Sequence, residues 1–269
     1  MIRLIATDMN GTLLDDNKNL PPDFDATLER LRRAGILFVA ASGRSYPALA
    51  PIFGEQNGSM GFICDNGAYV VQNGKNIFTS GIERETLREV VDVCHREIPE
   101  AYLVLCGQHG LYVTERDECR PRSQKELGFY YSSRTVLDDL GAVDDVIFKI
   151  AIYDENNPQE YSFPVLNRIY GDSLSLVVSG RLWMDIMQKD ISKGSAIRIL
   201  QNNLGITPDE TMAFGDFYND IDLLNAASYS FVMENANDDM KQYGRFTAES
   251  NNCSGVTKAI NKYLDENGF

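Results

Sequence analysis

Residues 2–8 read IRLIATD and residues 36–44 read ILFVAASGR. The second run is continuously apolar up to Ser42, which is typical of a strand buried on both faces of a parallel sheet. Between the two runs, residues 22–34 carry apolar side chains at helical spacing and are followed by a glycine, the usual stop for a helix. A strand, a helix and a second strand at this spacing predict a βαβ unit with a right-handed crossover.

The same alternation of helix and strand returns over residues 189–269. Residues 84–188 differ, because their predicted order of elements is typical of an antiparallel sheet with helices on one face. We therefore predict an α/β fold with a Rossmann-like, doubly wound parallel sheet as its core. Residues 1–83 and 189–269 form this core, and residues 84–188 form an inserted α+β domain. Within the core, Asn73-Gly74 predicts the turn of a β-hairpin.

The composition excludes several classes of function. The 269 residues carry a net charge of −14, and so acidic a surface repels phosphate backbones and anionic lipid, so we expect no nucleic-acid or membrane partner. No apolar run approaches the ~18 residues of a membrane-spanning helix, and the N-terminus does not resemble a signal peptide. The five cysteines form no CxxC pair, and we expect a reduced, cytoplasmic protein. With only two histidines, catalysis would depend on carboxylates, lysine and a metal ion.

Polar residues follow predicted strands or begin predicted helices in four places. These are residues 8–12, 42–44, 193–194 and 215–220. Each segment by itself is an ordinary turn or helix cap. Ligands of a doubly wound sheet, however, bind at the carboxyl ends of its strands, so the four segments can meet in one site.

Such a site would suit a phosphate and a metal ion. Asp8 and Asp216 come from different predicted strands and could hold Mg²⁺ with waters completing its shell. A hydroxyl, an ammonium and two backbone N–H groups could bind the phosphate oxygens. These groups belong to Ser42, Lys193, Gly11 and Thr12.

The segment Asp8-Met9-Asn10-Gly11-Thr12-Leu13 resembles the DxDGT signature of the haloacid dehalogenase superfamily of hydrolases. Ser42, Lys193 and residues 215–220 are similar to its second, third and fourth motifs, in that order. The domain inserted between the second and third motifs resembles the large α+β cap, called type IIB, of the Cof-like sugar-phosphatase branch. The triplets Asn66-Gly67-Ala68 and Ser192-Lys193-Gly194 also resemble that branch.

The resemblance implies a mechanism. Asp8 would attack the phosphorus of a phosphate ester and form an aspartyl-phosphate. Mg²⁺ would be held by Asp8, Asp216 and the backbone carbonyl of Asn10, and Asp220 would orient the metal's shell. Lys193 would position Asp8 and bind the phosphoryl group. The resemblance assigns phosphate or substrate binding to Gly11, Thr12, Ser42, Gly43, Arg44, Asn66 and Asn219.

Asn10 departs from the signature, which has a second aspartate at this position. In the family that aspartate protonates the leaving oxygen and then activates water, which is worth about 10²–10⁴ in rate. An amide can do neither, although its backbone carbonyl can still bind metal. Three explanations stay open: an engineered change that traps a complex, a natural variant that is slow or acts on good leaving groups, or a pseudo-enzyme that binds a phosphorylated metabolite.

We therefore predict a Mg²⁺-dependent phosphatase that hydrolyses a sugar phosphate or similar small phosphorylated metabolite and is impaired by Asn10. One alternative is a weak or inactive regulatory protein that binds a phosphometabolite. Another is a phosphomutase, which passes the phosphoryl group to a second hydroxyl. We expect a monomer or a weak homodimer. Trp183 and Tyr112 could line a sugar pocket, although aromatic residues in strands are more often core residues.

Overall fold

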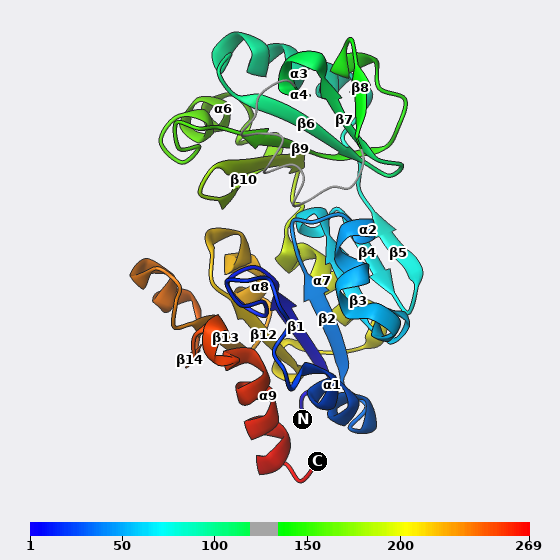
Figure 1. Cartoon of the computed structure of the whole chain (residues 1–269), viewed down its shortest axis with the longest axis vertical. Coiled ribbons are helices and arrows are strands. Elements are labelled where there is room, and N and C mark those ends of the chain that lie inside the picture. The colour runs from blue at the N-terminus through cyan, green and yellow to red at the C-terminus, as the bar shows by residue number, and fades with distance from the viewer. Residues whose placement is uncertain (119–133) are drawn as a thin grey trace.

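The computed structural model describes residues 1–118 and 134–269. In these described residues, two sheets, one of eight and one of six strands, lie in two lobes (Figure 1). We call residues 84–188 the cap and the remaining residues the core. Both chain ends lie at the far side of the core from the cap (Figure 1).

The core sheet has the strand order β14-β13-β12-β1-β2-β3-β4-β5. All pairs from β14 to β3 are parallel, and β4 and β5 are antiparallel additions at one edge. The strands are β1 (Leu4–Asp8), β2 (Leu37–Ala41), β3 (Gly61–Cys64), β4 (Tyr69–Gln72), β5 (Lys75–Thr79), β12 (Thr211–Gly215), β13 (Tyr229–Met233) and β14 (Phe246–Ala248). Asn73 and Gly74 both have positive φ in the tight turn between β4 and β5, which confirms the predicted hairpin.

Helices cover both faces of the core sheet, because the strands alternate their buried side chains between two apolar clusters. One face packs on α1 (Phe24–Arg33), α9 (Gly255–Glu266), the short α2 (Tyr46–Leu49) and a 3₁₀ segment (Ala50–Ser59). The other packs on α7 (Lys193–Leu204) and α8 (Ile221–Asn225). The predicted α/β class with a doubly wound sheet is confirmed. Within residues 189–269, 3₁₀ turns at Tyr218–Asp220 and Asp238–Tyr243 stand where the predicted alternation called for longer helices.

The cap sheet has the order β10-β11-β9-β6-β7-β8. Its strands are β6 (Tyr102–Gly107), β7 (Leu111–Thr114), β8 (Thr135–Leu137), β9 (Ile147–Tyr153), β10 (Leu174–Gly180) and β11 (Trp183–Gln188). The expectation of an antiparallel sheet was wrong at one edge, where β7 and β8 run parallel. Three largely exposed residues form β8, so no buried pattern marked this strand in the sequence. The helices in the described part of the cap are α3 (Arg84–Glu97), α4 (Glu115–Glu118) and α6 (Ser162–Tyr170).

The two faces of the cap sheet differ in character. Ile150 and Ile152 of β9 pack with α3 and α6 in one apolar cluster. Lys149 and Ala151 alternate with them and line a cavity shared with the core. Figure 1 shows the corresponding arrangement, with the cap sheet between its helices and the core. The cap therefore presents one face of its sheet to the core.

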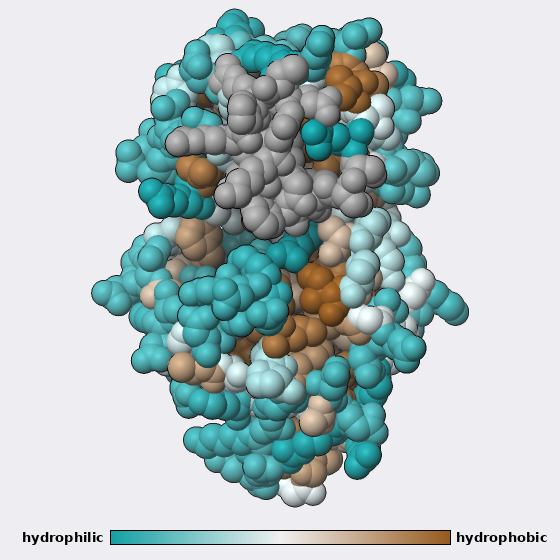
Figure 2. Space-filling view, viewed as in Figure 1, coloured by the Kyte–Doolittle hydropathy of each residue, from teal (hydrophilic) through white to brown (hydrophobic). Residues whose placement is uncertain are grey.

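Sheet membership supports the predicted division at residues 83/84 and 188/189, which stays a prediction. In the described part of the chain, no helix has both the length and the apolar character needed to cross a bilayer. The viewed face of the molecule is mainly hydrophilic, with small hydrophobic patches (Figure 2). Three cysteines are buried free thiols and Cys253 is an exposed one, while Cys119 lies outside the described residues.

Candidate active site

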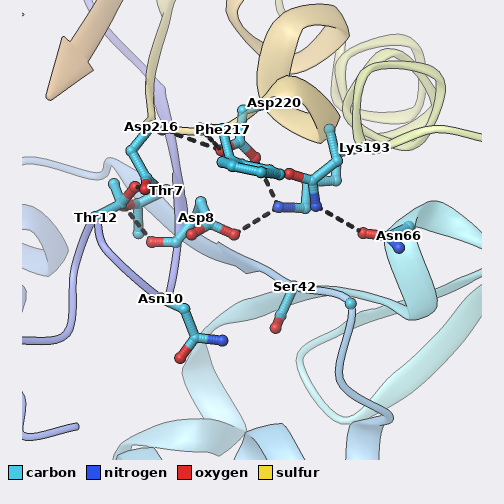
Figure 3. Close-up of polar contacts among 12 residues, drawn as sticks. Thr7, Asp8, Asn10, Thr12, Ser42, Asn66, Lys193, Asp216, Phe217 and Asp220 are labelled. Atoms are coloured by element: carbon cyan, nitrogen blue, oxygen red, sulfur yellow. Dashed lines mark hydrogen bonds and ion pairs between the residues drawn. The ribbon is translucent and has the colours of Figure 1, made fainter. Parts of the chain in front are cut away.

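The four predicted segments meet at one edge of the core sheet. Asp8 ends β1, and Asp216 and Ser42 directly follow β12 and β2. These strands are parallel neighbours, so their carboxyl ends lie side by side. Lys193, the first residue of α7, reaches the same point (Figure 3).

Lys193 is the centre of the charged cluster. Its side chain is fully buried, and Nζ donates to Asp8 Oδ1 at 2.5 Å and to Asp220 Oδ1 at 2.6 Å. Ser192 caps α7 through a reciprocal hydrogen-bond pair with Ser195, which places the first turn of the helix. Burial lowers the pKa of Lys193, but the charges of Asp220 and Asp8 raise it above its usual range. The ammonium therefore stays charged and holds the Asp8 carboxylate in one orientation.

Three carboxylates crowd around this single ammonium. Burial raises the pKa of Asp8 to about 6. The charge of Lys193 opposes this rise and the charge of Asp220 adds to it. Burial and the charges of Asp8 and Asp220 raise the pKa of Asp216 to about 8. Asp220 uses its second oxygen to accept the backbone N–H groups of Asp216 and Phe217 at 3.1 and 3.2 Å. Asp220 is thus the residue that shapes the loop after β12.

The cluster fits a divalent cation. One oxygen from each of Asp8, Asp216 and Asp220 lies within 4.8 Å of the others, and carboxylate oxygens are the ligands that Mg²⁺ prefers. One ammonium cannot neutralise three carboxylates. A cation would relieve the repulsion that, together with burial, raises the pKa values of Asp8 and Asp216. Asp8 and Asp216 line the cavity, whereas Asp220 is fully buried behind them.

Thr12 and Gly11 shape the carboxylate side of the site. Thr12 Oγ1 donates to Asp216 Oδ1 at 2.6 Å, so its hydroxyl holds a carboxylate. Gly11 has a φ of +81°, and a Cβ there would overlap the Asp216 carboxylate. A glycine is therefore required where the backbone passes the carboxylate at contact distance.

Asn10 follows β1 and contacts the loop after β2 through Arg44. Arg44 Nη2 donates to Asn10 Oδ1 at 2.8 Å, which fixes which end of the amide is the acceptor. In Figure 3 the Asn10 nitrogen lies on the side of Ser42. Ser42 is buried and its Oγ accepts the backbone N–H of Arg44 at 3.2 Å. Asn10 thus presents a hydrogen-bond donor where the family signature has an acid.

A cavity of about 230 Å³ lies between this edge and the cap. Of the predicted site residues, it is lined by Asp8, Asn10, Ser42, Gly43, Arg44, Asp216 and Asn219. The other predicted residues do not line the cavity but contact residues that do, or each other. They are Lys193, Gly11, Thr12, Asn66 and Asp220. The predicted set is thus brought together in one place, and its individual roles stay predictions.

Sequence reasoning missed several residues of the cavity wall. Lys18 reaches it from the loop after β1, and Lys149, Ser179 and Asp185 reach it from the cap. Of the two aromatic residues considered for a sugar pocket, Trp183 lines the cavity and also packs against an apolar cluster of the cap. Tyr112 does not line it, and its hydroxyl donates to Asp145 Oδ2 at 3.0 Å. The sequence could have indicated Lys149 and Asp185, because each is a charged residue with apolar neighbours on both sides in its strand.

Comparisons with known proteins agree with this geometry. The model of the haloacid dehalogenase-like hydrolases matches residues 5–260, and the chain belongs to that family, as the motifs predicted. It is 32% identical over 98% of its length to 96% of the Escherichia coli 5-amino-6-(5-phospho-D-ribitylamino)uracil phosphatase YbjI. It is 25% identical over 90% of its length to 87% of the HMP-PP phosphatase of Klebsiella pneumoniae. A crystal structure from Streptococcus mutans superposes with a TM-score of 0.93, at 26% identity, covering 98% of this chain and all of the other.

Proposed function

We propose that this chain is a phosphatase that hydrolyses a small phosphorylated metabolite through an aspartyl-phosphate on Asp8. The observation that carries the proposal is the pair of buried contacts from Lys193 to Asp220 and to Asp8, a residue that lines the cavity between the core and the cap. A carboxylate held this way is an oriented nucleophile. The two named relatives are also phosphatases.

In the first step, an Asp8 oxygen forms a bond to phosphorus and the bond from phosphorus to the leaving oxygen breaks. Lys193 and Ser42 stabilise the charge on the phosphoryl oxygens. In the second step, a water oxygen forms a bond to phosphorus and the bond from phosphorus to the Asp8 oxygen breaks. A proton of that water passes to solvent, inorganic phosphate leaves, and the Asp8 carboxylate is restored. A cap over the site excludes other water from the first step, and we propose this role for residues 84–188.

The site would use Mg²⁺ as its cation. Asp8 and Asp216 would hold the ion through carboxylate oxygens, with the backbone carbonyl of Asn10 as a third ligand, and Asp220 would orient the loop that carries Asp216. The ion would neutralise charge as the anionic nucleophile meets the anionic phosphate. In this chain, Thr12 orients the Asp216 carboxylate for that purpose.

Asn10 limits the range of substrates. Its amide donates a hydrogen bond but carries no titratable proton, so the leaving oxygen takes its proton from water. Phosphates whose leaving group is a weak base need no protonation and should react best. A sugar phosphate or a similar metabolite fits the cavity's polar walls, and an alkyl phosphate of that kind should react slowly with this chain.

The test compares the chain with Asn10→Asp in the presence of Mg²⁺. On an alkyl phosphate such as ribose 5-phosphate, we expect Asn10→Asp to raise kcat by about 10²–10⁴, the usual contribution of a general acid and base. On p-nitrophenyl phosphate the gain should be much smaller. Asn203→Asp, an exposed position on α7, is the matched control and should change neither rate.

Other outcomes identify the alternatives. Mg²⁺-dependent binding of inorganic phosphate without turnover in either form would indicate a regulatory binding protein, which Asn10 favours. Formation of an isomerised sugar phosphate, with no free phosphate, would indicate a phosphomutase. Failure of Asn10→Asp to gain activity on any phosphate would contradict the phosphatase proposal.

A further inference from the structure

A buried group of charges joins the cap sheet to the phosphate side of the core. Lys149 of β9 is 4% exposed, and its Nζ donates to the backbone carbonyl of Gly43 at 2.6 Å. Gly43 stands between Ser42 and Arg44, the two residues of this loop whose side chains face the cavity. A side chain of the cap therefore contacts the backbone of the core loop that follows β2.

Asp185 of β11 completes the connection. Its Oδ1 lies 3.3 Å from Lys149 Nζ, and its Oδ2 accepts Asn66 Nδ2 at 2.5 Å. Asn66 in turn accepts a hydrogen bond from Asn219 Nδ2 at 3.1 Å. We call Lys149, Asp185, Gly43 and Asn66 the clasp. Through Gly43 and Asn66, the clasp contacts the loops after β2 and β3, and through Asn219 it reaches the loop after β12.

The clasp buries two charged side chains, and fold stability by itself does not account for them. Lys149 and Asp185 are both almost fully buried, and a buried ion pair is often no more stabilising than apolar residues of the same volume. Both occupy strand positions whose neighbours are apolar. Neither side chain is needed to fill the apolar cluster between the cap sheet and its helices, since both point to the other face.

We propose that Lys149 and Asp185 are positioning residues, which orient the Ser42–Arg44 loop and Asn66 for phosphate binding when the cap is seated on the core. The inference rests on the proposed phosphatase function and deepens it. Lys149 holds the Gly43 carbonyl, which sets the direction of the peptide groups on either side of it. Asp185 holds the Asn66 amide and keeps Lys149 in place.

The consequence is that the phosphate site contacts the clasp directly, while the metal site is connected to it only indirectly, through the Asn66–Asn219 hydrogen bond. Asp8 and Asp216 belong to the core and have no hydrogen bond to the cap in the described part of the chain. Ser42 and Arg44, in contrast, flank the residue that Lys149 holds. Loss of the clasp should therefore weaken phosphate binding and leave Mg²⁺ binding unchanged, which a general structural defect would not do.

The experiment measures binding of Mg²⁺ and then of inorganic phosphate by titration calorimetry. For Lys149→Met we expect the Kd of phosphate to rise on the order of 10- to 100-fold, the usual effect of misplacing binding groups by about 1 Å, with an unchanged Kd for Mg²⁺. KM for p-nitrophenyl phosphate should rise with it. Arg88→Met is the matched control, because Arg88 also donates to a backbone carbonyl, that of Gly141 at 2.8 Å, but entirely within the cap. It should change neither constant.

Asp185→Asn provides a second variant if Lys149→Met does not fold. It keeps the size of the side chain and an acceptor for Asn66, and it should weaken phosphate binding by a smaller factor in the same direction. Equal phosphate affinity in the unaltered chain and the clasp variants would overturn this inference only. Absence of phosphate binding and turnover in the unaltered chain would overturn the proposed function, and the inference with it.

Discussion

Asp65 is a carboxyl group buried where the cap meets the core. It is 1% exposed, and neither of its carboxylate oxygens accepts a hydrogen bond from the described residues. Lys149 Nζ lies 3.9 Å from its Oδ1, which offsets only part of the cost of burial. Burial is the main reason that the pKa of Asp65 rises to about 6. Ionised Asp65 therefore lowers the stability of the fold at neutral pH.

This raised pKa predicts a pH dependence of stability. Between about pH 4 and pH 6, folded Asp65 holds a proton that the unfolded chain has released, so the free energy of unfolding falls as pH rises through this window. Asp65→Asn removes that dependence. Relative to the unaltered chain, the variant should gain about 3 kcal/mol between pH 4 and pH 7, from 1.36 kcal/mol for each unit of pKa shift.

Urea denaturation at a series of pH values measures the difference. Asp138→Asn, at an exposed position of the cap, is the control and should give a curve parallel to that of the unaltered chain. A parallel curve for Asp65→Asn as well would show that the buried carboxyl does not titrate in this window.

At the scale of elements, the close packing of α7 on α8 positions Lys193. Gly194 follows Lys193 in the first turn of α7, and a Cβ at this glycine would overlap the backbone carbonyl of Asp222 in α8. The two helices therefore approach closely because Gly194 has no side chain. α8 in turn follows the loop that Asp220 shapes, so one helix contact links two of the site's charged residues.

Gly194→Ala should separate these helices. Helix propensity by itself favours alanine by up to about 1 kcal/mol, but the forced displacement should make the net effect a loss of about 1–3 kcal/mol in the free energy of unfolding. Turnover should fall with it, because Lys193 moves relative to Asp8. Thermal denaturation and phosphatase assays measure both. Gly58→Ala, which has open space around it, should be close to neutral, and equal stability of Gly194→Ala would refute the close approach.

At the scale of the whole molecule, the net charge of −14 sets what the protein attracts. The acidic surface repels large polyanions, while the carboxylate cluster at the end of the core sheet offers a small cation a defined place. An acidic protein can bind a small phosphate in this way, because the bound cation reverses the local sign of the field. Charge at the surface and charge in the site therefore have different roles.

Mg²⁺ should stabilise the fold through this site. At 100 times its Kd, a ligand that binds only the folded chain adds about 2.7 kcal/mol to the free energy of unfolding, and calorimetry should record a higher Tm that a chelator reverses. Asp216→Asn should lose most of the shift. NaCl at matched ionic strength controls for screening of the net charge, and an equal shift with NaCl would contradict a specific site.

The positions of Asp8, Ser42 and Asp216 at one edge could be predicted from the sequence, because each follows a buried strand and parallel strands end together. The Asn73-Gly74 hairpin and the alternation of helix and strand in the core could also be predicted, because both depend on local sequence pattern. The parallel edge strand β8 could not be predicted, since its three residues are largely exposed and only pairing with β7 defines it.

What the sequence by itself determined is the core fold, the family and the residue types at the end of its sheet, because these depend on short-range periodicity and on motifs of a few residues. Only the tertiary structure decided which cap residues face the residues at the end of the core sheet. Lys149 and Gly43 are 106 residues apart in the sequence, and Asp185 and Asn66 are 119 residues apart. No local sequence pattern predicts contacts between residues so far apart. These contacts depend on how the cap sheet is seated on the core, which is set by packing over the whole interface between them.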